Sequence, residues 1–147
     1  MTRQRTIFWI GLLIYGASFL LVAVAGPAVP SGPARGYHSA FLPLLVPLAE
    51  VQAILRSARS DLGAAEFFSL LITGLINPVF VFTTILMLRK PDQRPVSILR
   101  AIVLLMIPFS WAVFHYEDLY PREGYFLWII GMLLVLFSNK VATIHSP

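Results

Sequence analysis

The stretch Phe67–Leu88 constrains the fold of this chain more than any other, because its 22 residues carry no formal charge. At a rise of about 1.5 Å per residue, a helix over this stretch would be about 33 Å long. The hydrocarbon layer of a membrane is about 30 Å thick. The sequence therefore predicts that Phe67–Leu88 is a membrane-spanning helix.

The composition agrees with a membrane protein. Of the 147 residues, 58% are hydrophobic and 12% are charged, whereas soluble domains carry about 25% charged residues. The chain has no cysteine, which excludes disulfides, thiolate nucleophiles and metal sites built from cysteine. The net charge of +4 comes from basic residues beside the apolar stretches, so membrane topology explains it better than nucleic-acid binding.

Three further apolar stretches are predicted to span the membrane, at residues 7–25, 98–116 and 124–142. Short connections place the third and fourth spans antiparallel beside the span before them. We therefore predict an all-α integral membrane protein, a four-transmembrane-helix up-down bundle with a single domain over residues 1–147. A cleaved signal peptide is the alternative for the first stretch, but its apolar run is longer than the ~7 to 15 residues typical of such signals.

The outer connection between the first two spans, residues 26–65, has three parts. Gly26–Gly36 is rich in proline and glycine and is predicted to be irregular. Tyr37–Ala49 is apolar but short and contains two prolines, which favours an interfacial or re-entrant segment. Apolar residues recur at helical spacing over Leu48–Leu62, which predicts an amphipathic helix on the membrane surface or over the bundle.

Basic residues predict the orientation of the bundle. The side that holds both termini and the 89–100 turn has seven basic residues and one acid: Arg3, Arg5, Arg89, Lys90, Arg94, Arg100, Lys140 and Asp92. The opposite side has four basic residues and six acids: Arg35, Arg56, Arg59, Arg122, Glu50, Asp61, Glu66, Glu117, Asp118 and Glu123. Both termini are therefore expected in the cytoplasm, with a bacterial inner membrane as the expected location. Arg100 is expected to extend toward the headgroups.

Aromatic residues near the predicted span ends are expected to form interfacial belts. Trp9 lies near the inner boundary. Residues toward the outer boundary are Trp111, Tyr116, Tyr120, Tyr125 and Trp128. These positions agree with the four spans and with their predicted direction.

One face of the second span is polar. Its members fall within an arc of about 80° on a helix and are Glu66, Ser69, Thr73, Asn77 and Thr84. Asn77 lies near mid-membrane, and Pro78 beside it removes a backbone hydrogen bond to Gly74. Two interpretations follow: the stripe joins neighbouring helices by hydrogen bonds, or it lines a substrate or ion path at a kinked helix.

Small residues mark faces of the first and fourth spans, where they allow helix backbones to approach closely. The first face contains Gly11, Tyr15, Ser18 and Ala25, and the second contains Gly131, Val135 and Ser138. We expect both faces to serve packing.

A second candidate site lies at the outer end, where Glu66, His115, Glu117 and Asp118 are expected to converge, with Tyr37 and His38 reaching over from the long connection. Histidine and carboxylates are ligands for zinc or iron and can also transfer protons. The spacing matches no metal or catalytic motif. The sequence therefore predicts no metal and no cofactor, and gives no positive support for an enzyme.

Three functions stay open at this point. The first is a protein that packs against other membrane chains, as an accessory, assembly or regulatory subunit, or assembles with itself. The second is a small transporter or lipophilic-ligand binder that uses the polar stripe and kink. The third is an outer-face membrane enzyme or metal protein around His115. The expected partners are membrane lipid and other membrane proteins or a second copy, and not nucleic acid.

Overall fold

The computed structural model describes residues 3–26, 33–55, 63–89, 94–116 and 118–143. The chain is mostly helical. The elements in order are α1 (Arg3–Ser18), β1 (Val22–Ala25), β2 (Ala34–Arg35), α2 (Gly36–Leu55), α3 (Ala64–Arg89), α4 (Arg94–Tyr116), β3 (Tyr120–Pro121) and α5 (Glu123–Thr143). Among the described residues, α3 and α4 are long and apolar enough to cross a membrane.

Three predicted helices are found close to their expected positions, and one is shorter. Helices α3, α4 and α5 cover the predicted stretches 67–88, 98–116 and 124–142. The prediction of a helix over residues 7–25 was wrong in its second part, because α1 ends at Ser18 and Val22–Ala25 is a strand. Valine has a high strand propensity, and here the backbone of Val22–Ala25 has a pairing partner on each side.

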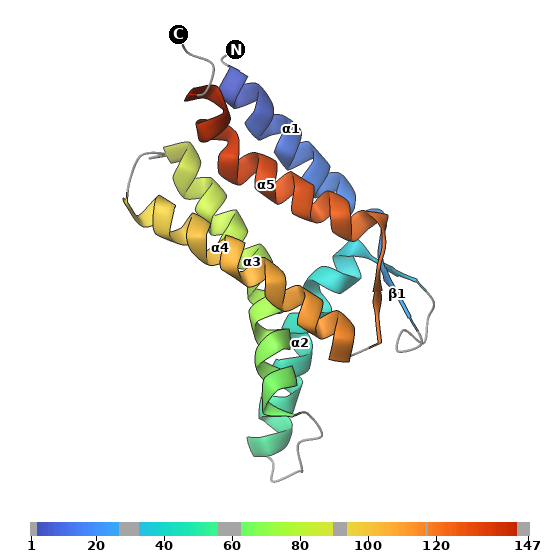
Figure 1. Cartoon of the computed structure of the whole chain (residues 1–147). Coiled ribbons are helices and arrows are strands. Elements are labelled where there is room, and N and C mark those ends of the chain that lie inside the picture. Colours follow the sequence, from blue (N-terminus) through green and yellow to red (C-terminus); the bar gives the residue numbers. More distant parts are fainter. Residues whose placement is uncertain (1–2, 27–32, 56–62, 90–93, 117, 144–147) are drawn as a thin grey trace.

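A small antiparallel sheet, in the order β2-β1-β3, was not predicted by the all-α assignment. Val22 pairs with Arg35 on one side of β1, and Val24 pairs with Pro121 on the other. The Arg122 N–H donates to the Ala23 carbonyl at 2.8 Å. The sheet therefore joins the end of α1, the start of α2 and the connection from α4 to α5 (Figure 1).

Helix α2 corrects the predicted outer segment. The sequence suggested a short apolar piece followed by a separate amphipathic helix, but a single helix runs over Gly36–Leu55, through Pro43 and Pro47. Pro47 is fully buried, and α2 packs on α3. Apolar packing against a neighbouring helix helps to maintain a helix that lacks backbone donors at its prolines. The predicted continuation over residues 56–62 lies outside the described residues.

Helices α1 and α5 lie side by side along their length (Figure 1). A Cβ atom at Gly131 would lie 2.5 Å from the Tyr15 backbone nitrogen, and one at Gly11 would lie 2.9 Å from the Val135 nitrogen. Only glycine fits at so close a backbone approach. The predicted small faces are confirmed in α1 and α5, where Gly11, Tyr15, Ser18, Gly131, Val135 and Ser138 are all buried.

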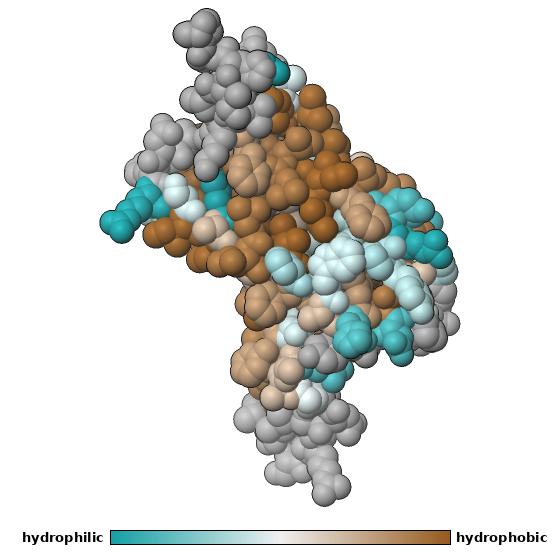
Figure 2. Space-filling view, viewed as in Figure 1, coloured by the Kyte–Doolittle hydropathy of each residue, from teal (hydrophilic) through white to brown (hydrophobic). Residues whose placement is uncertain are grey.

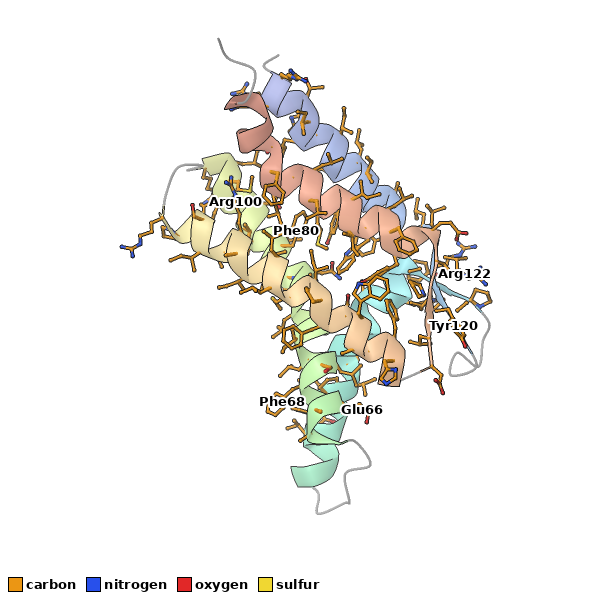
Figure 3. The ribbon with its side chains drawn as sticks, viewed as in Figure 1. Glu66, Phe68, Phe80, Arg100, Tyr120 and Arg122 are labelled. Carbon is orange, nitrogen blue, oxygen red and sulfur yellow. The ribbon has the colours of Figure 1, made fainter. Side chains whose placement is uncertain are left out.

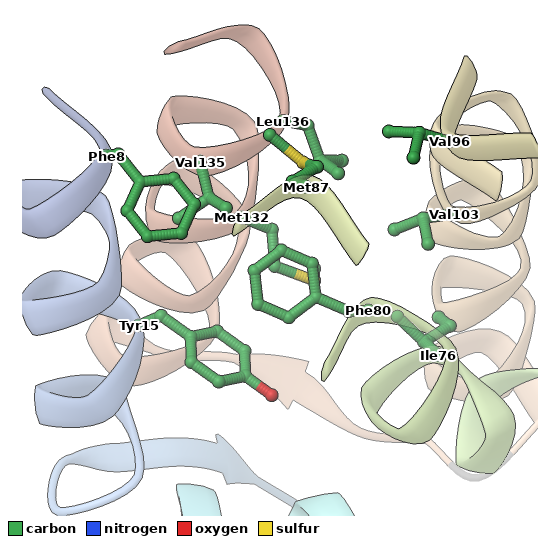
Figure 4. Close-up of a cluster of buried hydrophobic side chains, with 10 residues drawn as sticks. All are labelled: Phe8, Tyr15, Ile76, Phe80, Met87, Val96, Val103, Met132, Val135 and Leu136. Atoms are coloured by element: carbon green, nitrogen blue, oxygen red, sulfur yellow. The ribbon is translucent and has the colours of Figure 1, made fainter. Parts of the chain in front are cut away.

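The core lies between α1 and α5 on one side and α3 and α4 on the other (Figure 4). Its buried members are Phe8, Tyr15, Ile76, Phe80, Met87, Val96, Val103, Met132, Val135 and Leu136. Phe80 is fully buried and lies against the Tyr15 ring, with ring centroids 4.6 Å apart. Helix α3 therefore brings the two helix pairs together at the level of Phe80.

Candidate functional site

Asn77 forms the centre of a hydrogen-bonded junction between three helices. The Tyr15 hydroxyl of α1 donates to the Asn77 Oδ1 atom at 2.9 Å, and the Trp128 Nε1–H of α5 donates to the same atom at 2.8 Å. The indole N–H can only donate, so the amide oxygen must face it. An amide oxygen has two lone pairs, and both now have a donor. We call Tyr15, Asn77 and Trp128 the Asn77 junction.

The aromatic rings around the Asn77 junction continue it toward α4. The ring centroids of Trp128 and Tyr125 are 5.6 Å apart. The hydroxyl oxygens of Tyr125 and Ser110 are 2.6 Å apart. Ser110 donates its only hydroxyl proton to the Ile107 carbonyl at 2.7 Å, so the Tyr125 hydroxyl must be the donor to Ser110. Side chains with polar groups thus connect α1, α3, α5 and α4.

The other predicted stripe residues do not join this network. The Thr84 hydroxyl donates to the Phe80 carbonyl of its own helix at 2.9 Å. Ser69 is buried, Glu66 is half-buried in the first turn of α3, and Pro78 is exposed. Helix α3 continues through Pro78 without a break. The stripe is therefore divided, and only Asn77 makes hydrogen bonds to other helices among those seen in the described residues.

Thr73 differs from the other hydroxyl residues. Its Oγ1 atom is buried and has no hydrogen-bond partner among the described residues. A buried hydroxyl without a partner costs about 1 to 3 kcal/mol. Thr73 precedes Asn77 by four residues, so both lie on the same side of α3. Among the described residues of the stripe, Thr73 therefore has a buried hydroxyl that no side chain or carbonyl satisfies.

The predicted outer-face residues have mainly local roles. His38 is exposed in the first turn of α2, where its ring centroid lies 4.1 Å from that of Tyr37. His115 is exposed in the last turn of α4. Glu117 lies outside the described residues. Across the part of the chain that the structure describes, no three histidine or carboxylate side chains are grouped to hold a metal ion.

Asp118 has a backbone role at the end of α4. Its φ angle is 49°, which lies in the left-handed region. The next residue, Leu119, donates its N–H to the Phe114 carbonyl at 3.0 Å, the six-to-one bond of a Schellman helix end. Asp118 therefore ends the helix, and its exposed side chain is not needed for that bond.

The predicted direction of the Arg100 side chain was wrong. Arg100 was expected to extend outward, but its Nε and Nη2 atoms are buried (Figure 3). It lies four residues after Val96 and three before Val103, both buried, so helical geometry puts it on the core face. Tyr125 and Trp128 were assigned to an interfacial belt, yet both make hydrogen bonds within the protein. Trp9, Trp111 and Tyr120 of the predicted belts are exposed.

Sequence reasoning identified Asn77 but missed its two donors. Tyr15 lies on the small face of α1, next to the glycine contact, and this position was a usable signal that it faces inward. Trp128 carried no such signal, because an interfacial tryptophan and an inward-facing one look the same in one sequence. Its role depends on the rotation of α5 about its axis.

No protein-family model, curated protein or solved structure matches this chain. The function must therefore be inferred from the geometry of the protein. That geometry consists of a mostly helical chain with two candidate spanning helices, a polar junction directed inward, and apolar faces directed outward.

Proposed function

We propose that this chain is an integral membrane protein with four spans in an up-down bundle and both termini in the cytoplasm. Helices α3, α4 and α5 form three of the spans, and the shorter α1 forms the first together with residues 19–25. A bacterial inner membrane is the proposed location. The protein acts by packing against other membrane chains, as an accessory, assembly or regulatory subunit, or by self-assembly. It uses no cofactor in this role.

The exposed surface of the protein supports the membrane location. Leu13 of α1, Leu20 just after α1 and Leu105 of α4 are 72%, 71% and 69% exposed. Contiguous apolar surface of this kind is rare on soluble monomers. Figure 2 shows an apolar belt across the helices, with hydrophilic residues at the start of α4 and around the sheet. Such a belt suits a hydrocarbon layer between two polar boundaries.

The observation that carries the packing role is the contrast between inside and outside. Inside, both acceptor positions of the Asn77 oxygen are occupied by side chains of this chain, as expected of a junction that holds helices together. Outside, only 22% of the candidate span in α4 is buried, against 39% in α3. Helix α4 therefore has more surface than α3 to offer a neighbouring chain.

Membrane integration and orientation are tested with single cysteines, since the natural chain has none. The protein is expected to stay with membranes after an alkaline carbonate wash. Tyr120→Cys, at an exposed position in β3 (Figure 3), should react with a membrane-impermeant maleimide on cells whose outer layers admit the reagent. Arg3→Cys should react only after the inner membrane is opened. The reverse labelling would overturn the orientation, and loss from washed membranes would overturn the location.

The packing role is tested by photo-crosslinking from α4. Leu105→Cys, at an exposed position, and Val103→Cys, at a fully buried one, each receive a benzophenone maleimide in native membranes. We expect a discrete crosslinked partner or dimer from position 105, and at position 103 either no label or only crosslinks within the chain. A protein that stays a lone monomer from both positions would contradict the role.

A second candidate function is binding of a lipophilic ligand, favoured by the buried Thr73 hydroxyl without a partner. A ligand with one polar group would bind between the helices and hydrogen-bond to this hydroxyl. Native mass spectrometry of the wild type and Thr73→Val tests it. A small molecule that co-purifies with the wild type and is lost in the variant would favour binding. Equal spectra would favour the packing role.

A further inference from the structure

Four exposed arginines lie at the end of the molecule away from the sheet. Arg3 and Arg5 are in the first turns of α1, Arg89 is the last residue of α3, and Arg94 is the first residue of α4. These helix ends share one end of the molecule (Figure 1). We call these four arginines the basic end. In sequence, the connection between Arg89 and Arg94 adds Lys90 and Asp92.

Helix stability does not explain three of these arginines. Helices α1 and α4 start at the basic end, and neither has an acid in its first turn. Helices α3 and α5 carry Glu66 and Glu123 in their first turns, where a negative charge complements the positive end of the helix dipole. An arginine at a helix start opposes that dipole. The basic end therefore concentrates positive charge at a cost to its own helices.

We propose that the basic end binds the phosphate groups of anionic phospholipids in the cytoplasmic leaflet. This inference rests on the proposed membrane location and orientation. The apolar belt reaches the start of α4 (Figure 2), so a bilayer that covers the belt places Arg94 at headgroup level. A guanidinium forms paired hydrogen bonds with phosphate oxygens. Each basic residue at an anionic surface strengthens attraction by about fivefold.

Around the sheet, the described residues carry a different charge pattern. The exposed arginines Arg35 and Arg122 share the sheet region with the exposed acids Asp118 and Glu123. Mixed charge gives a weak net attraction for an anionic surface. The two arginines near the sheet equal either half of the basic end in number, and only the basic end should respond to anionic lipid.

The test uses the purified full chain in neutral detergent, titrated with dioleoylphosphatidylglycerol or dioleoylphosphatidylcholine. Tryptophan fluorescence during heating gives Tm at each lipid concentration. The variants are R3Q/R5Q/R89Q/R94Q, the two half variants R3Q/R5Q and R89Q/R94Q, and the control R35Q/R122Q. The half variants preserve the test if the fourfold variant does not fold.

We expect phosphatidylglycerol, and not phosphatidylcholine, to raise the Tm of the wild type. The phosphatidylglycerol concentration that gives half of the maximal rise in Tm should be about tenfold or more higher in the fourfold variant than in the wild type. It should increase less in each half variant, and it should stay within about twofold of the wild-type value in the control. About 0.5 M salt should weaken the effect, because it screens exposed charges.

Three results would overturn the proposal. The first is an equal rise in Tm with the two lipids. The second is a phosphatidylglycerol response that is unchanged in the fourfold variant and in both half variants. The third is a rise in Tm with inorganic phosphate as large as that with phosphatidylglycerol, which would indicate a site for soluble anions. A protein that resists carbonate extraction but shows one of these results keeps its membrane location and loses the lipid site. A protein released by carbonate loses the location itself.

Discussion

Helices α1 and α5 meet at their backbones, whereas α3 and α4 meet through larger apolar side chains. The first contact depends on Gly11 and Gly131, at which a Cβ atom would lie within 3 Å of the opposite helix. The second contact contributes Ile76 of α3 and Val103 of α4 to the core, both fully buried. A backbone contact has no side chain that can move aside, so it should tolerate substitution far less than a side-chain contact.

The two pairs also differ in what they contribute to the centre of the molecule. Tyr15 and Trp128 of the α1 and α5 pair donate to Asn77, while α4 contributes buried apolar side chains such as Val103. We expect this division to make the α1 and α5 pair the less tolerant of substitution. The following substitutions test this division.

The largest effect is expected from Gly131→Ala. The added methyl would lie 2.5 Å from the Tyr15 nitrogen and 2.8 Å from its Cα atom, so the helices must separate. We expect a loss of about 3 kcal/mol or more in unfolding free energy, at the upper end of overpacking costs. Thermal unfolding in detergent measures it.

Gly16→Ala is the matched control, because a Cβ atom there would meet nothing within 4 Å. Alanine is the better helix former, so this variant should gain about 0.5 to 1 kcal/mol. Equal Tm values for the variants at positions 131 and 16 would show that α1 and α5 do not make the backbone contact.

Asn77→Leu should have the next largest effect. It removes two hydrogen bonds, each worth about 0.6 to 2 kcal/mol between membrane helices, and leaves the Tyr15 hydroxyl and Trp128 N–H without their acceptor. Unfolding free energy should fall by about 1 to 4 kcal/mol. Thr84→Val, which removes a bond within one helix, should change it by less than about 0.5 kcal/mol. Similar losses in both variants would show that the Asn77 junction does not join the helix pairs.

The fold was predictable where one apolar run determines one helix. A run of about 20 apolar residues predicts a spanning helix whatever its neighbours are. The stretches 67–88, 98–116 and 124–142 were predicted in this way, and α3, α4 and α5 cover them. The strand Val22–Ala25 was not predictable, because its pairing depends on other segments, one of which, Tyr120–Pro121, is distant in sequence. Helix α2 was missed for a related reason. Its two prolines argue for a break locally, and packing on α3 decides otherwise.

The site was predictable only in part. Helical periodicity places Asn77 on an inward face without knowledge of its partners. Its donors come from residues 62 and 51 positions away in sequence, and one helix turn of sliding between helices would change them. Hydroxyl groups add a further ambiguity, because Thr84 on the same face bonds to its own helix instead. A polar stripe therefore marks an inward face and does not say which residue makes the contact.

A smaller effect is expected within α4, where a buried and an exposed residue are two positions apart. Val103→Ala removes two methyl groups from a fully buried side chain and should cost about 1 to 2 kcal/mol. Leu105 is 69% exposed, so Leu105→Ala should cost less than about 0.5 kcal/mol. Tm in detergent compares them. A larger loss at position 105 would mean that the outward face of α4 is buried, for example in a dimer that persists in detergent.

At Asp118, in the turn that leads from α4 to the sheet, the sign of the effect is expected to depend on the new residue. The φ of 49° at Asp118 suits glycine better than aspartate, and a β-branched residue least. Asp118→Gly should therefore gain up to about 1 kcal/mol, and Asp118→Val should lose about 1 to 2 kcal/mol. Urea or thermal unfolding of both variants checks the signs. A loss of stability in Asp118→Gly would show that the carboxylate itself contributes at the outer face, and would revive the predicted site with His115.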